Sequence, residues 1–120
     1  MSLDVAYAAM GGDLETVRKR LMTDERIEKF AKIFLQDESM QNLEKALEAG
    51  DMAEAFRAAH TLKGVSRDLG FTPLYDAACV MSDALRPNDA GEPAAPEQVP
   101  ELLPTTRDAY QLVVDSIAII

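Results

Sequence analysis

The most constraining feature of the sequence is a succession of apolar side chains spaced three and four residues apart, interrupted by glycine and proline. Ile27, Phe30 and Phe34 follow this spacing, and comparable runs end at Gly50 and Gly70. Such spacing places apolar residues on one face of an α-helix, whereas glycine and proline end helices. Aromatic residues make up only 6% of the chain and tryptophan is missing, which weighs against a β-sandwich or barrel. The sequence therefore predicts an all-α protein.

The pattern divides the chain into an arm, four bundle helices and a linker. A length of 120 residues with 48% hydrophobic content suits one compact domain. The predicted bundle helices cover residues 24–49, 51–69, 72–86 and 105–119. Residues 1–22 are predicted as a short N-terminal helical arm, and residues 87–104, with five of the six prolines, as an exposed Pro-rich linker. Asp37 leaves open whether the first range is one helix or two. Amphipathic helices with short connections predict an antiparallel four-helix bundle.

The charge balance disfavours several kinds of partner. Twelve Lys and Arg against 21 Asp and Glu give a net charge of −9, which opposes binding to nucleic acid and to anionic membranes. No apolar run is long enough to span a bilayer, and Met1 to Met10 carries no basic residue, so neither a membrane span nor a signal peptide is expected. Cys79 has no partner cysteine, which fits a reducing compartment. The expected location is cytoplasmic.

Resident cofactors are also not expected. One histidine and one cysteine cannot supply the ligand cluster of a structural zinc site. Gly11-Gly12 lacks the Gly-Lys-Ser/Thr that completes a phosphate-binding loop. We therefore expect no metal and no cofactor bound by this chain.

His60 is the only histidine, and it lies on the polar side of the predicted helix 51–69. Small and apolar residues form the opposite stripe of that helix: Met52, Ala55, Ala59, Leu62, Ser66 and Leu69. At about 100° per residue, His60 lies about 130° from the centre of this stripe, so we expect the imidazole to face solvent. The competing interpretations are a structural histidine in the core and a surface histidine without function.

Three cations and a glycine accompany His60 on its side of the helix. Arg57, Lys63 and Arg67 lie within two turns of the imidazole. In an acidic chain, this basic group suits the binding of a phosphoryl group, although charged runs are commonly only solvated faces. Gly64 lies one turn after His60, where glycine costs about 1 kcal/mol relative to alanine. We expect the missing side chain to open an approach path for a partner.

The residues His60-Thr61-Leu62-Lys63-Gly64, followed by Ser66 and Leu69-Gly70-Phe71, resemble the signature of histidine-containing phosphotransfer (HPt) domains. The lead-in Gly50-Asp51 and the turn into the next helix extend the resemblance over residues 50–86. The resemblance implies a four-helix bundle whose exposed histidine receives a phosphoryl group from the aspartate of a receiver domain and passes it to another. It also implies that the chain has no intrinsic kinase activity.

Each residue of the motif then receives an expected role. His60 is the candidate phosphoacceptor, because a neutral imidazole can attack phosphorus with a ring-nitrogen lone pair. Lys63 is expected to stabilise the phosphoryl group as a point charge, and Gly64 to give the partner access. Arg57 and Arg67 are expected to support them.

The helix that follows His60 is expected to supply a residue that orients the imidazole. Some family members place a carboxylate there, and the resemblance assigns its position to Ser82, so the acid is missing; Asp83 is the neighbouring alternative. Phe56 or Phe34, if exposed near His60, is expected to anchor a partner helix.

We therefore predict a phosphotransfer module of a two-component phosphorelay, with His60 carrying a phosphoryl group between aspartates of receiver domains. The expected partners are receiver domains of response regulators or hybrid sensor kinases, with Mg²⁺ bound by the receiver, and the chain is expected to be a monomer. Two alternatives stay open: a docking or adaptor bundle without transfer, and the phosphoacceptor fragment of a chemotaxis-type histidine kinase.

Overall fold

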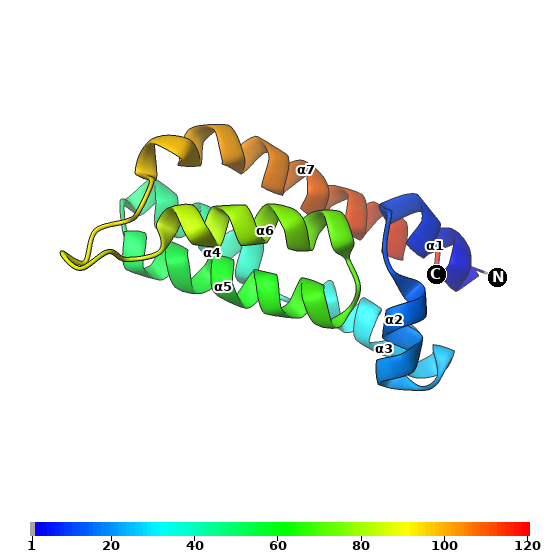
Figure 1. Ribbon diagram of the computed structural model, residues 1–120. Coiled ribbons are helices and arrows are strands. Elements are labelled where there is room, and N and C mark those ends of the chain that lie inside the picture. Colours follow the sequence, from blue (N-terminus) through cyan, green and yellow to red (C-terminus); the bar gives the residue numbers. More distant parts are fainter. Residues whose placement is uncertain (1) are drawn as a thin grey trace.

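The structure, a computed structural model that describes residues 2–120, consists of helices joined by short connections (Figure 1). In chain order the elements are α1 (Ser2–Met10), α2 (Leu14–Leu21), α3 (Asp24–Phe34), α4 (Ser39–Ala49), α5 (Met52–Asp68), α6 (Thr72–Leu85), the 3₁₀ helix η1 (Pro96–Gln98) and α7 (Val99–Ile117). The all-α prediction is confirmed, since residues 2–120 contain no strand beyond an isolated bridge between Pro87 and Pro93. None of the helices among these residues is long and apolar enough to cross a membrane.

The long helices pack side by side into an elongated bundle of 48 × 23 × 20 Å (Figure 1). α4 packs on α5, α5 on α6, and α6 on α7. The largest fully buried side chains are Leu3, Tyr7, Met10, Ile27, Phe34, Met40, Leu43, Leu62, Phe71, Leu74, Met81 and Leu85. These side chains belong to one hydrophobic core cluster, and burial of each contributes about 1.5 to 3 kcal/mol of gross free energy.

The helix that carries the site has well-defined ends. The Asp51 carboxylate accepts a hydrogen bond of 3.1 Å from the Glu54 N–H and so caps α5. Gly50 ends α4 in the left-handed conformation, at φ 71°. Pro73 lies in the first turn of α6, where no N–H is required. The predicted bounds 51–69 and 72–86 are therefore confirmed to within one residue.

The N-terminal arm is attached to the turn between α5 and α6. The Tyr7 hydroxyl donates a hydrogen bond of 2.7 Å to the Leu69 carbonyl, and burial raises the pKa of this hydroxyl. The Asp13 N–H donates to the Gly70 carbonyl at 2.8 Å. In addition, α1 packs against α7, at the end of the bundle where the chain terminates (Figure 1). The arm is thus an integral part of the packed structure.

The range 24–49, for which the sequence left one helix or two open, forms two helices. α3 ends at Phe34, and α4 begins at Ser39. Between them, the Asp37 carboxylate accepts a hydrogen bond of 2.8 Å from the Ser39 N–H. Such local bonds from Asp compete with the helical backbone pattern, and here they favour the break.

The predicted linker 87–104 is wrong in its second half. α7 begins at Val99 rather than at residue 105, and η1 precedes it directly. Pro100 lies in the first helical turn, where its missing N–H costs no bond. Pro104 lies inside α7 and removes one backbone bond, which the rest of this long helix tolerates. The number of prolines alone therefore overestimates the length of the linker.

Two glycines with left-handed backbones offer a test of the arm's attachment. A Cβ at Gly70 (φ +68°) would lie 2.4 Å from Val17 Cγ2 and 2.7 Å from the Asp13 carbonyl oxygen, whereas a Cβ at Gly50 (φ +71°) would meet nothing within 4 Å. Gly50→Ala should lower the free energy of unfolding by about 1–2 kcal/mol, the cost of the backbone conformation alone. Gly70→Ala should lower it further. Urea denaturation of both variants measures the difference, and equal losses would show that the arm does not press on this turn.

Candidate functional site

His60 lies in the middle of α5 with its side chain exposed, as the helical spacing predicts. On the opposite face of the helix, Ala55, Ala59 and Leu62 are completely buried. This burial fixes the rotation of α5 about its axis. The imidazole is therefore directed into solvent by the packing of the bundle.

An aromatic ring lies against the imidazole. The ring centroids of Phe56 and His60 are 6.0 Å apart, and the planes meet at 29°. The guanidinium carbon of Arg86 lies 5.4 Å from the centroid of the Phe56 ring, and Arg86 Nη2 lies 3.3 Å from Asp83 Oδ1. Arg86 is thus part of the site although sequence reasoning missed it. The antiparallel register of α5 and α6 about their turn was the signal that could have placed it opposite Phe56.

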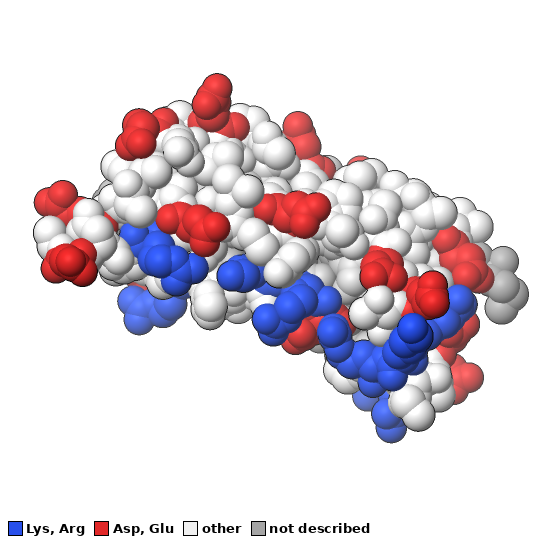
Figure 2. All heavy atoms as spheres, viewed as in Figure 1, with Lys and Arg blue, Asp and Glu red and all other residues white. Residues whose placement is uncertain are grey.

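The three predicted cations differ in their partners. Arg57 forms an ion pair with Glu54, and Arg67 Nε lies 3.4 Å from the Asp68 carboxylate. The half-buried Lys63 forms no ion pair with any residue that the structure describes. Figure 2 shows Lys and Arg side chains gathered along one edge of the molecule, over α5 and α2, below a region with more acidic side chains. An added anion beside His60 would therefore meet Lys63 without having to displace a carboxylate.

Gly64 leaves open space on the surface next to His60. A Cβ built at this position meets no atom within 4 Å, apart from the helix's own nearby backbone. No close packing requires a glycine at this position. The observation supports the expected access path.

Ser82 does not lie at the surface next to His60, where the sequence reasoning placed it. Its side chain is completely buried, on the same face of α6 as Ala78 and Leu85. Its hydroxyl oxygen has no hydrogen-bond partner among residues 2–120. The expectation that Ser82 orients His60 is therefore wrong in this structure, and the neighbouring Asp83 is instead paired with Arg86.

Phe34 is also unable to act as a partner anchor. It is buried and packs edge to face on Phe71, with the centroids 5.1 Å apart. Phe30 and Ile33 of the same helix are the exposed residues, with 40% and 50% of their surfaces accessible. The anchoring expectation was therefore wrong for Phe34, while Phe56 is half-buried next to His60.

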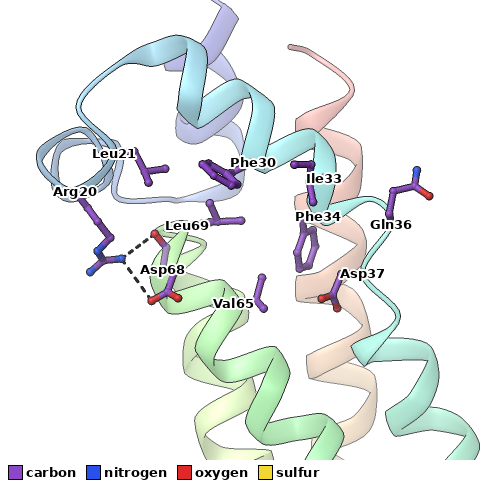
Figure 3. Close-up of a pocket in the computed structure, with 10 residues that line it drawn as sticks. All are labelled: Arg20, Leu21, Phe30, Ile33, Phe34, Gln36, Asp37, Val65, Asp68 and Leu69. Atoms are coloured by element: carbon purple, nitrogen blue, oxygen red, sulfur yellow. Dashed lines mark hydrogen bonds and ion pairs between the residues drawn. The ribbon is translucent and has the colours of Figure 1, made fainter.

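A groove of about 540 Å³ lies between α2, α3 and the C-terminal part of α5 (Figure 3). Its lining is mostly apolar and includes Leu21, Phe30, Ile33, Val65 and Leu69. At one side, Arg20 donates hydrogen bonds to the backbone carbonyls of Arg67 and Asp68, at 3.2 and 2.8 Å, and so caps the end of α5. Sequence reasoning missed this groove, because the groove depends on the orientation of α3 relative to α4, which the sequence pattern does not specify.

The fold and the site together define a helical bundle that presents one imidazole to solvent, beside a lysine without an ion pair and an unobstructed glycine. The family model of the Hpt domain matches residues 29–115, most of the chain and all of this site. The chain therefore belongs to the Hpt domain family, whose members act in histidine phosphotransfer in two-component signalling and interact with receiver or kinase partners. Searches of curated proteins and of solved structures gave no significant match.

The open space at Gly64 predicts opposite effects on stability and on partner binding. Gly64→Ala should raise the free energy of unfolding by about 0.5–1 kcal/mol, because it replaces a helical glycine without a clash. Gly64→Gln should be at least as stable as the parent chain yet bind a receiver domain about tenfold more weakly, because its side chain fills the approach path. Thermal melts and binding titrations test both effects. Unimpaired binding by Gly64→Gln would refute the access role.

Proposed function

We propose that this chain is a phosphotransfer module in which His60 accepts a phosphoryl group from the aspartate of one receiver domain and passes it to the aspartate of another. The observation that carries the proposal is the exposure of the only histidine on α5, inside the segment that matches the Hpt domain. We interpret α4 to α7 as an antiparallel four-helix unit that acts as a cytoplasmic monomer in a phosphorelay.

The transfer step requires little from this chain besides the imidazole. A ring-nitrogen lone pair of neutral His60 attacks the phosphorus of the aspartyl phosphate. The P–N bond forms as the P–O bond to the aspartate breaks, and the carboxylate leaves with the bonding electron pair. The second ring nitrogen keeps its proton during the attack. Transfer to the next receiver reverses these changes on a new aspartate.

Charge neutralisation is shared between the partners. Phosphoryl transfer depends mainly on positioning and on electrostatic stabilisation of the transferred group. Lys63 supplies one positive charge from this side, while Arg57 and Arg67 add a weaker field because each already has a carboxylate partner. We expect Mg²⁺ bound by the receiver to supply the remaining positive charge, so no resident cofactor is required here.

We infer that the receiver also contacts the groove next to α5. Val65 of α5 and Leu69, which follows directly at the end of that helix, line the groove, so the groove adjoins the helix that carries His60. The basic side chains over α5 and α2 in Figure 2 complement the anionic surface of a phosphorylated receiver. The exposed Phe30 and Ile33 offer apolar contact area at the same end of the bundle.

Incubation with a phosphorylated receiver tests the central claim. The parent chain should gain a phosphate that is labile in acid and stable in base, as expected for phosphohistidine. His60→Gln should gain none, because the amide has no nucleophilic ring nitrogen, while its binding to the receiver persists. Radiolabel retention after acid and base treatment gives the measurement. Binding by the parent chain without any transfer would instead favour a docking or adaptor bundle.

Lys63→Ala tests the electrostatic role. It should slow transfer about 1.4-fold to fivefold, which corresponds to the 0.2–1 kcal/mol of an exposed ion pair, and should hardly change the melting temperature. Lys45→Ala, which removes an exposed lysine from α4, is the matched control and should transfer at the parental rate. A large fall in the melting temperature of Lys63→Ala would mean that this side chain supports the fold rather than the site.

A further inference from the structure

The exposed imidazole of His60 lacks a polar group that could hold it in one orientation. Within residues 2–120 its ring nitrogens make no hydrogen bond. The aromatic ring that lies against it is that of Phe56. Ser82, at the position expected to hold the ring, is buried and unpartnered. An exposed side chain normally moves among several rotamers, whereas group transfer is fastest when the attacking atom is already aligned. Another residue must therefore restrict the ring if it is to be aligned.

Phe56 lies where a helical side chain at position 60 naturally rests. Side chains in an α-helix lean toward the N-terminus and cover the turn that precedes their own Cα. The His60 ring consequently lies over the residue four positions earlier. The centroid separation of 6.0 Å and the plane angle of 29° are within the range of offset-stacked aromatic pairs.

The Phe56 ring is itself held in place. It is half-buried and packs against the apolar core. Arg86, at the end of α6, places its guanidinium carbon 5.4 Å from the Phe56 centroid, within the range of a cation–π contact. The Asp83 carboxylate pairs with Arg86 at 3.3 Å. Contacts within α5 and from the end of α6 thus hold the Phe56 ring in place. They also restrict the imidazole that stacks on it.

We propose that Phe56 is the positioning residue of His60, and that Arg86 keeps the Phe56 ring in place. The stack restricts the imidazole, so that a ring nitrogen points toward the incoming phosphorus. Phe56 does not contact the transferred group in this role, because it acts only through His60. The inference rests on the proposed function of His60, and it accounts for a site that works without a carboxylate at position 82.

Two variants of Phe56 separate the aromatic ring from its bulk. Phe56→Leu removes the ring and keeps an apolar side chain, whereas Phe56→Tyr keeps the ring. In NMR spectra of the unphosphorylated full chain, the His60 ring protons should carry a ring-current shift in the parent chain and in Phe56→Tyr. In Phe56→Leu they should move toward the values of a solvent-exposed histidine. This measurement needs no receiver.

Transfer kinetics provide the functional readout. In single-turnover transfer from a phosphorylated receiver, Phe56→Leu should lower the maximal rate about twofold to tenfold. The reason is that the aligned orientation of the His60 ring becomes less populated when the aromatic stack is lost. The half-saturating receiver concentration should stay the same, and Phe56→Tyr should restore the rate. Arg86→Met should give a smaller decrease and a smaller NMR shift, whereas Arg26→Met, which removes an exposed arginine from α3, should change neither.

Three outcomes would overturn the positioning role. The first is unchanged His60 ring signals in Phe56→Leu. The second is a higher half-saturating concentration with an unchanged maximal rate, which would make Phe56 a partner contact. The third is an unchanged ring signal in Arg86→Met if Phe56→Leu does not fold. Failure of the parent chain to accept phosphate would refute the proposed function instead, and the ring signals would still decide whether Phe56 restricts the imidazole.

Discussion

Close packing of one face of α5 is the interaction on which the rest of the structure depends. Ala55 and Ala59 are small enough for neighbouring helices to approach closely, and Leu62 is completely buried on the same face. This packing sets the rotation of α5, and therefore the direction of every side chain on its outer face. His60 is held outward by the core itself rather than by a bond at the site. Fold stability and site geometry thus share one cause.

The outer face combines a local positive field with an acidic chain. The net charge is −9, yet the basic side chains gather along α5 and α2 (Figure 2). Charges separated by more than about 8–10 Å are largely screened at physiological ionic strength, so the local cations dominate what a docking phosphoryl group experiences. Lys63 is the member of this group without a carboxylate partner in residues 2–120. In the proposed transfer the site needs few residues, because the receiver would bring the leaving group and most of the charge stabilisation.

Sequence periodicity and capping residues were sufficient to predict α5, α6 and the exposure of His60. They failed where a side chain depends on its neighbours in space. Ser82 lies on the buried face of α6, because a shift of one position on a helix rotates a side chain by about 100°. Arg86 reaches Phe56 from another helix, and this contact depends on a rotamer that no local pattern specifies. Pro104 shows a further limit, because a proline count does not reveal whether the helix around it tolerates the loss of one bond.

The attachment of the N-terminal arm makes the packed structure larger than the segment that matches the Hpt family. The Hpt match begins at residue 29, whereas Tyr7 packs against Phe71, with the ring centroids 6.0 Å apart, and bonds to the Leu69 carbonyl. A fragment cut at the family boundary would leave this aromatic cluster uncovered and the carbonyl without its donor. Exposed apolar surface of this kind favours aggregation, so we expect a stable fragment to include α1.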